Sequence, residues 1–273
     1  MIGMRLDGRL GNQLFQYALA FSIAKKYHTF YIIDNDYKVD AVKKYFKTNK
    51  LLNNKISRGL FKKLIAPKLP FIHEKGEADI NEILALINNH QFYKGYFQSE
   101  LFFQNIADSI QQYFRLKPFY TKAFYKKYQY LFAQKKVLAI HYRLGDYLTW
   151  GTIEQGGADL TLPESYYRNA LKQIKDLDTY TIVIVTDDTK SIAGKLPEIE
   201  NKIIVSDTEI NDLQVLMNAD IIIASNSSFC WWAAYLNPKK PVIFAPRYWL
   251  GFKVKKEMPA NIIARKFTKV ETY

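Results

Sequence analysis

The chain lacks the residues that mark several classes of protein. Among its 273 residues there is one cysteine, Cys230, which excludes an internal disulfide and a zinc site built from several cysteines. Because Cys230 lies in an apolar run, we expect a small core residue rather than a nucleophile. Neither G-x-G-x-x-G nor G-K-[ST] occurs, so both the dinucleotide-binding fingerprint and the P-loop are missing.

Long apolar runs are missing as well. No stretch approaches the ~20 apolar residues that span a bilayer. Residues 1–6 include Arg5 and lead into a glycine loop, whereas a secretory signal would continue into an apolar segment. We therefore expect a cytoplasmic protein.

Acidic residues are scarce relative to basic ones, 26 against 39, which gives a net charge of +13. This favours anionic partners, such as nucleotides or an anionic membrane surface. The basic residues concentrate in 51–70 and 120–136, which contain no acid. The second segment predicts a helix that either rests on anionic lipid or, as we favour, packs on the core with its lysines in solvent. No nucleic-acid-binding module is present, so nucleic acid is not an expected partner.

The second half of the chain alternates short apolar strands with helices. We predict strands over 137–141, 180–186, 202–205, 220–224 and 241–245, and helices over 162–174, 208–219 and 225–237. The first half begins in the same way, with strands over 2–6 and 29–34 around a helix over 13–27, but 35–90 shows few clear strands. Alternation of this kind indicates parallel sheets covered on both faces. We therefore predict an α/β fold of two units, 1–132 and 133–273, with a ligand cleft lined by strand ends.

Two stretches follow predicted strands and carry polar groups suited to phosphate. In "VLAIHYRLGDY" the strand ends in His141 and Arg143, and a guanidinium can bind two phosphate oxygens at once; the alternative is that Arg143 pairs with Asp146 in an ordinary turn. In "SNSSFCWWAAYLN" a helix begins near Ser227. Amide groups at a helix start carry partial positive charge and can hold phosphate, although a capped core helix explains the same residues.

Three further stretches are weaker signals. Asp187 and Asp188 in "VTDD" could bind a metal, act as a base, hydrogen-bond a nucleobase, or cap a following helix. The glycines of "DGRLGNQLFQYA" permit a tight turn that presents Asn12 at a helix start. "DND" at 34–36 imitates a D-x-D metal motif, but we favour a turn there.

Taken in order, "GRLGNQLFQYA", H-x-R-x-G-D-Y, "TDD" and "SNSSF" followed by "WW" resemble glycosyltransferase family 11, the α-1,2-fucosyltransferases. "LPESYY" and "APRYW" fit the same family. The resemblance implies a GT-B fold, with two Rossmann-like domains facing a central cleft. Residues 1–132 would form the acceptor side and 133–273 would bind GDP-fucose. The implied enzyme is a galactoside α-1,2-fucosyltransferase, inverting, with no metal or other cofactor.

The resemblance also implies roles for single residues. Arg143 would grip the donor diphosphate, and His141 would lie beside the guanine or ribose. Asp188 would contact guanine, and Asn12 would orient the acceptor or donor. The residues implied to contact phosphate are Ser227, Ser228 and Phe229.

The resemblance leaves two roles unassigned, the second cation and the general base. Relatives usually carry a second arginine where this chain has Leu144, and Arg247 or a lysine is the candidate replacement. Asp146 is the candidate base, unless it only orients Arg143; Glu154 and Asp7 are the others, and an oxocarbenium-like transition state would need no strong base.

Three alternatives to this function remain. The first is a GT-B transferase that uses another nucleotide sugar. The second is a metal-dependent transferase that uses Asp34, and the third is a basic polyanion-binding protein without catalysis. For the favoured function the expected partners are GDP-fucose and a galactose-terminated oligosaccharide or glycolipid, with peripheral contact to the inner face of the plasma membrane as a further hypothesis.

Overall fold

The structure is a computed structural model that describes residues 1–35, 39–48, 54–74, 79–192 and 194–273. The chain divides into two compact units. Unit 1 comprises Met1–Lys117 and Pro259–Ile262, and unit 2 comprises Pro118–Met258 and Ile263–Tyr273. The boundary therefore lies at Lys117, earlier than the predicted 132.

Helix α6 (Pro118–Tyr128) explains the earlier boundary, because it packs on α9 (Glu209–Met217) of unit 2. Phe124 and Tyr128 of α6 are buried, and the Lys127 ammonium lies 2.8 Å from an Asp207 carboxylate oxygen. The lysines of α6 are exposed. The interpretation of 120–136 as a core-packed helix with lysines in solvent is thus confirmed.

Unit 1 contains a parallel sheet in the order β2-β1-β4-β3. Its strands are β1 (Ile2–Arg5), β2 (Tyr31–Asp34), β3 (Phe71–His73) and β4 (Phe92–Lys94). The first two were predicted. The other two lie in or just beyond the region with few clear strands, and each has only three residues, too short for a periodic pattern.

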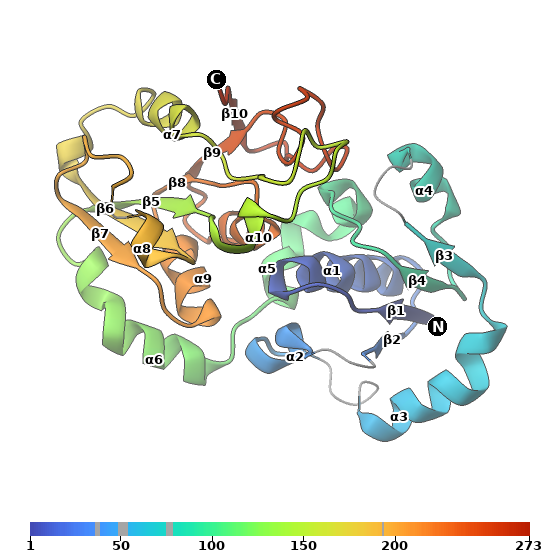
Figure 1. Ribbon diagram of the computed structural model, residues 1–273. Coiled ribbons are helices and arrows are strands. Elements are labelled where there is room, and N and C mark those ends of the chain that lie inside the picture. The colour runs from blue at the N-terminus through green and yellow to red at the C-terminus, as the bar shows by residue number, and fades with distance from the viewer. Residues whose placement is uncertain (36–38, 49–53, 75–78, 193) are drawn as a thin grey trace. The chain divides into compact units, whose positions relative to one another are not determined.

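Helices cover both faces of this sheet. The apolar helix α1 (Leu10–Lys26) packs on β1 and β2, and Figure 1 shows it running along the sheet. On the other face Phe61 packs so closely that a Cβ on Gly3 would lie 2.6 Å from its ring, which requires glycine there. The remaining helices of unit 1 are α2 (Ala41–Tyr45), α3 (Lys55–Leu60), α4 (Ile80–Leu86) and α5 (Ile110–Tyr113), with a π-helical turn Phe61–Ile65 and 3₁₀ segments Ala66–Lys68 and Glu100–Ser109.

Unit 2 contains a parallel sheet in the order β10-β9-β8-β5-β6-β7. Its strands are β5 (Lys136–Tyr142), β6 (Tyr180–Thr186), β7 (Lys202–Val205), β8 (Ile221–Ile223), β9 (Val242–Pro246) and β10 (Thr268–Val270). All but β10 were predicted. The chain leaves β5 on one side towards β7, then returns to β8 on the other side. Strand order therefore reverses between β5 and β8, the place where open α/β sheets bind ligands.

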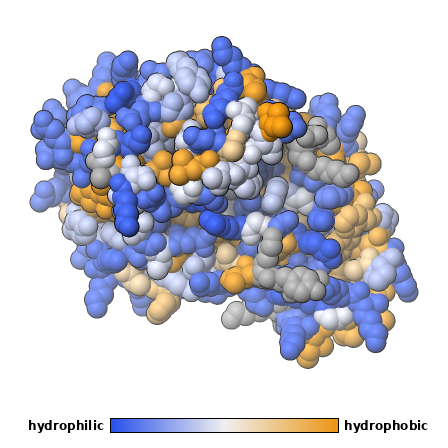
Figure 2. Space-filling view, viewed as in Figure 1, coloured by the Kyte–Doolittle hydropathy of each residue, from blue (hydrophilic) through white to orange (hydrophobic). Residues whose placement is uncertain are grey.

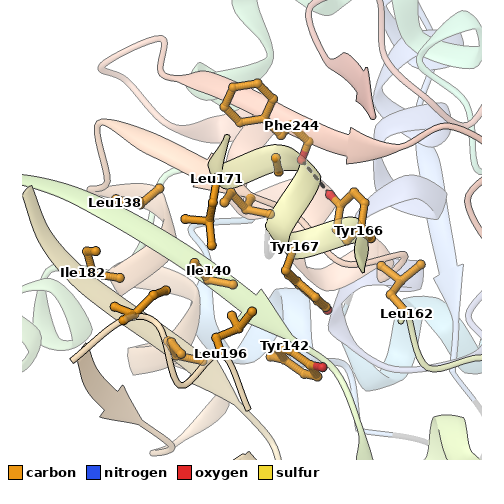
Figure 3. Close-up of a cluster of buried hydrophobic side chains, with 14 of the residues drawn as sticks. Leu138, Ile140, Tyr142, Leu162, Tyr166, Tyr167, Leu171, Ile182, Leu196 and Phe244 are labelled. Carbon is orange, nitrogen blue, oxygen red and sulfur yellow. Dashed lines mark hydrogen bonds between the residues drawn. The ribbon is translucent and has the colours of Figure 1, made fainter. Parts of the chain in front are cut away.

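Layers of helices enclose this sheet. Helix α7 (Glu164–Leu171) covers one face, while α9 and α10 (Ser228–Leu236) lie on the other. The cluster under α7 includes Leu138, Ile140 and Tyr142, so alternate residues of β5 point to α7 (Figure 3). His141 consequently faces the α10 side. The remaining helical segments of unit 2 are α8 (Thr189–Ile192) and the 3₁₀ segments Gln129–Phe132, Gly145–Leu148 and Leu177–Thr179.

Buried tyrosines tie α7 to the sheet. The Tyr167 ring stacks on that of Tyr142 at 4.1 Å. The Tyr166 hydroxyl donates to the carbonyls of Ala224 and Phe244, at 2.5 and 3.2 Å, and Figure 3 marks the second bond. Burial of such side chains contributes roughly 1.5–3 kcal/mol each. The Tyr166 hydroxyl thus links α7 to the end of β8 and to β9.

Within the described residues no helix is both long and apolar enough to cross a bilayer.

Candidate functional site

Three of the predicted stretches meet at one edge of the unit 2 sheet. Because β5 lies between β6 and β8 and all three are parallel, their carboxyl ends share that edge. It therefore collects His141 and Arg143, the aspartates after β6, and the serine-rich turn between β8 and α10. The sequence predicted the strands, and the strand order brings the polar groups together.

His141 occupies the point of reversal between β5 and β8. Its side chain is buried, and its Nδ1 lies 2.7 Å from the Ser225 hydroxyl. Its ring centre is 5.8 Å from that of Phe229. Burial, with a smaller effect of the Arg143 charge, lowers the pKa of His141 to about 3. The imidazole is therefore neutral near pH 7, and it offers hydrogen bonds rather than charge.

Arg143 is held between two carboxylates. Its Nη2 donates to Asp146 at 2.5 Å, and its Nη1 lies 3.1 Å from a carboxylate oxygen of Asp187. The side chain is 17% exposed, and its Nε is buried without a hydrogen-bond partner among the described residues. The sequence-based alternative, a pair with Asp146, is present, but a second carboxylate from the neighbouring strand joins it.

Asp187 organises the turn after β5. One of its carboxylate oxygens accepts from the Leu144 amide at 2.9 Å, while the other contacts Arg143. Gly145 has φ +21°, and a Cβ there would lie 2.3 Å from the second oxygen. Only glycine admits the carboxylate at this position. The sequence offered several roles for the pair and the resemblance singled out Asp188; neither predicted the contact of Asp187 with Arg143, because contacts between strands are not visible in a local pattern.

Asp188 caps the short helix α8. Its carboxylate accepts from the amides of Lys190 and Ser191 and, at 2.6 Å, from the Ser191 hydroxyl. The hydrogen bonds from Ser191 hold the pKa of Asp188 below its ordinary value. In this structure Asp188 thus serves as the helix cap that the sequence offered as one reading.

The serine-rich turn leads from β8 into α10. Ser227 precedes the first helical residue with extended backbone, and its side chain makes no capping bond to the helix. Helix α10 has no acidic residue in its first turn, so no carboxylate of that turn offsets the partial positive charge of the helix start. Asn226 is buried; its Nδ2 donates to the Leu160 carbonyl at 2.9 Å, and its Oδ1 has no partner among the described residues.

Tyr147 joins Arg143 to this turn. The Arg143 guanidinium lies 5.3 Å from the centre of the Tyr147 ring. The Tyr147 hydroxyl donates to the Asn226 carbonyl at 3.2 Å. Burial raises the pKa of Tyr147 to about 12, while Arg143 and a hydrogen bond with Ser227 act in the opposite direction. Sequence reasoning missed this residue, although it closes the H-x-R-x-G-D-Y motif.

The candidate for the second cation, Arg247, lies at the same edge of the sheet but two strands from β5, since β9 runs parallel to β8. Leu144 belongs to the buried cluster under α7, where an arginine would be desolvated. Arg247 follows β9 and pairs with Glu271 at 2.5 Å. Glu154 is exposed.

Asn12 belongs to unit 1, in the first turn of α1. Its Oδ1 accepts from the Gln98 side chain at 2.7 Å. The preceding Gly8 has φ +71°, and a Cβ there would collide with Asn12, so this glycine is required. Asp7 accepts from the Gly8 amide at 2.7 Å. The predicted glycine turn that presents Asn12 at a helix start is present.

Asp34, from the "DND" stretch, is already neutralised. It is buried and accepts from the Arg5 guanidinium at 2.8 Å, and the Lys62 ammonium lies 3.9 Å away. Asp36 lies outside the described residues. Among the residues that are described, no group of three His, Cys, Asp or Glu could hold a metal ion.

Cys230 is buried in α10. Burial raises the pKa of its thiol far above the ordinary value, which keeps the thiol protonated and unreactive. The expectation of a small core residue is confirmed.

Two sequence relatives match almost the whole chain. The O-antigen biosynthesis glycosyltransferase WbnK of Escherichia coli is 23% identical over an alignment that covers 93% of this chain and 96% of that protein. An alpha-1,2-colitosyltransferase of Escherichia coli is 24% identical, over 90% of this chain and 91% of its own length.

Solved structures share the fold. Fucosyltransferase NodZ from Bradyrhizobium superimposes with a TM-score of 0.58 at 15% identity, over 87% of this chain and 92% of that one. Arabidopsis thaliana FUT1, solved as a variant in complex with GDP, gives 0.52 at 12% identity, over 90% of this chain and 70% of that one. These likenesses, with the two parallel sheets, confirm the predicted α/β fold of the GT-B type. The model of the family described as Glycosyl transferase family 11 matches residues 1–263, and the chain therefore belongs to glycosyltransferase family 11.

Proposed function

We propose that this glycosyltransferase moves L-fucose from GDP-fucose to the 2-hydroxyl of a galactoside, with inversion and without a metal. The donor is supported by a similar fold whose structure was obtained from a NodZ alpha-1,6-fucosyltransferase soaked with GDP-fucose. The linkage is supported by the alpha-1,2-colitosyltransferase, which is a relative by sequence. The galactoside acceptor rests on the motif resemblance.

One observation carries the donor half of this proposal. Arg143 and the start of α10 flank the point where strand order reverses, and Tyr147 connects them. As the sugar–oxygen bond breaks, negative charge builds on the leaving diphosphate. A guanidinium and a helix start, fixed in position beforehand, stabilise such charge without reorganising. Ser227 precedes α10, Ser228 and Phe229 are its first two residues, and in this proposal all three contact the phosphate.

The carboxylates beside Arg143 serve to orient it. Asp146 and Asp187 approach the guanidinium from two loops, so its plane is set before the donor arrives, and the diphosphate would take over contacts that they now make. One oxygen of Asp146 already accepts from the Arg143 guanidinium. We therefore assign Asp146 to orientation of Arg143 rather than to deprotonation of the acceptor.

The remaining predicted residues take binding roles in this proposal. His141, being neutral, hydrogen-bonds the ribose or guanine rather than the diphosphate. Asp188 accepts a hydrogen bond from guanine, using carboxylate lone pairs that the bonds to Lys190 and Ser191 do not occupy. Asn12, on unit 1, orients the acceptor or the fucosyl group.

A second donor has a specific observation in its favour. Because one relative is named for colitosyl transfer, nucleotide-activated colitose is the alternative to GDP-fucose. The chemistry assigned to Arg143 and the start of α10 applies to either sugar, since both act on the diphosphate.

The direct experiment is to incubate the protein with GDP-fucose and a panel of β-galactosides and to determine the linkage of the product. An α-1,2-fucosylated galactoside, formed equally well in EDTA, is expected. Transfer of colitose but not fucose would show that the donor is nucleotide-activated colitose. A 1,6 linkage would show that the acceptor hydroxyl is not the 2-hydroxyl. GDP, but not UDP or CMP, should raise the melting temperature, because a ligand stabilises the state it binds. Salt-sensitive binding to polyanions without any effect of GDP would favour a non-catalytic protein.

A further inference from the structure

An apolar stripe faces solvent on unit 1. Ile56, Leu60 and Leu64, from α3 and the π-helical turn after it, are 75%, 55% and 55% exposed. Their spacing of four residues places them on one side of the helical segment. Exposed aliphatic side chains gathered in this way mark interaction surfaces more often than isolated ones do.

The stripe is held outward by packing on the opposite side of the same segment. Phe61 is 1% exposed and stacks on Phe92 of the sheet, with ring centres 6.1 Å apart. Arg58 pairs with Asp40 at 3.7 Å. The segment is thus anchored to unit 1 through residues other than the stripe, which leaves the stripe available for a partner.

The surroundings of the stripe are basic. Residues 54–70 contain five lysines and arginines and no acid, and Lys55, Lys63 and Lys68 are exposed. Over α3, at the lower right of the view, Figure 2 shows hydrophobic side chains beside hydrophilic ones. Apolar residues interleaved with lysines on a helix surface are the pattern of a segment that lies in a membrane interface.

We propose that this surface docks the protein on an anionic membrane. The aliphatic side chains would enter the boundary between headgroups and acyl chains, and the lysines would meet lipid phosphates. A second copy of the chain fits less well, because contact would bring together two basic patches on molecules of charge +13. The proposal is independent of the sugar donor, since none of these residues belongs to the site on unit 2.

Helix α6 supplies a matched control. It is the other basic segment, but its large apolar residues Phe124 and Tyr128 are buried, while Lys122 and Lys126 are exposed. The double substitutions Lys55→Glu with Lys63→Glu and Lys122→Glu with Lys126→Glu change the net charge equally. The first pair lies beside the exposed stripe, and the second lies on a helix whose large apolar residues Phe124 and Tyr128 are buried.

The test is flotation of the purified protein with vesicles of phosphatidylcholine alone or mixed two to one with phosphatidylglycerol. We expect binding to the mixed vesicles only. The α3 double variant should bind at least ~10-fold more weakly, the α6 double variant within about twofold of wild type. Ile56→Ser with Leu60→Ser and Leu64→Ser should also weaken binding ~10-fold while the melting temperature stays unchanged, because these positions are exposed.

Three results would overturn the proposal. The first is wild-type protein that ignores the mixed vesicles. The second is an equal loss in both double variants, which would assign binding to overall charge. The third is a concentration-dependent dimer that the serine substitutions abolish, which would show that the surface binds a second copy of the chain.

Discussion

The Arg143 guanidinium lies over the Tyr147 ring, and the hydroxyl of that ring holds the Asn226 carbonyl. One side chain thereby couples the cation at the end of β5 to the turn that begins α10. This coupling fixes the spacing of the two groups that we assign to the diphosphate. Such rigidity favours catalysis, because hydrogen-bond donors that are already in place stabilise the negative charge developing on the diphosphate without moving.

Loss of Arg143 should abolish most of the activity. Arg143→Ala removes a fixed donor for the diphosphate and leaves two carboxylates facing it, so we expect kcat/KM to fall by at least ~10²-fold. Arg168→Ala is the matched control, since that arginine also pairs with two carboxylates, Glu164 and Glu198, but lies on helix α7 rather than at a strand end. The measurement is kcat/KM of both variants with GDP-fucose, with melting curves to confirm that each is folded. Near-normal turnover in folded Arg143→Ala would contradict the assignment.

Tyr147 should contribute to activity by holding Arg143 and the turn before α10 in place. Tyr147→Phe keeps the ring beneath Arg143 but loses the hydroxyl bond, and we expect a fall in kcat of about fivefold. Tyr147→Leu also loses the cation–π contact, so kcat should fall further. Tyr125→Phe is a suitable control, because the Tyr125 hydroxyl bonds Asn218 away from this edge. A general loss of stability with kcat unaffected would reduce Tyr147 to a packing role.

Gly145→Ala should displace the Asp187 carboxylate from Arg143. The added Cβ would meet a carboxylate oxygen at 2.3 Å, so the ion pair must open. We expect kcat/KM to fall about tenfold or more, because misplacement of a catalytic group by ~1 Å is costly. Gly157→Ala shares the positive φ but meets nothing within 4 Å, and its activity should be retained. Equal activity of the two variants would argue against pre-orientation of Arg143 by Asp187.

Buried His141 should make the protein acid-sensitive. Its pKa is about 3 when folded, against an ordinary 6.5, so between these values the unfolded chain binds a proton that the folded one does not. Stability contributed by neutral His141 is therefore lost as pH falls from about 6.5 towards 3, by up to ~1.4 kcal/mol per pH unit. Urea unfolding of wild type and His141→Asn across this window measures the difference. If the free energy of unfolding varied with pH in the same way for both proteins, the pKa of His141 would not be lowered by burial.

Asp212 should have the opposite pH dependence. Burial raises its pKa to about 7 from an ordinary 3.8, so the folded state keeps a proton that the unfolded state releases. The free energy of unfolding then declines as pH rises from about 4 to 7. Asp212→Asn retains an acceptor for the Asp207 amide, at 3.0 Å in the wild type, and should be more stable than wild type at pH 8 but not at pH 4. A stability difference that does not vary with pH would contradict the raised pKa.

The sequence predicts the strands that build the site better than it predicts the contacts within it. Strands β5 and β6 are apolar along most of their length, because both faces are covered by helices, so their ends could be placed. Strands β3 and β10 have three residues each, mostly exposed, and give no such pattern. The predicted division placed α6 with the first unit, whereas its buried aromatic residues attach it to unit 2.

Contacts between strands explain what sequence reasoning missed. Asp187 and Asp188 are neighbours in the chain, yet one pairs with Arg143 and the other caps α8. That division depends on the register of β5 with β6 and on the room left by Gly145. Tyr147 reaches the turn before α10 only because β8 pairs with β5. None of these distances is encoded in a local pattern of residues.

The central claim is that Arg143 and the start of α10 together hold the departing diphosphate. A crystal structure of the protein with GDP tests it most directly. The account predicts pyrophosphate oxygens within hydrogen-bond distance of the Arg143 guanidinium and of the first amides of α10, with no cation between them. A pyrophosphate that lies away from both groups, or that is coordinated by a bound divalent ion, would contradict it.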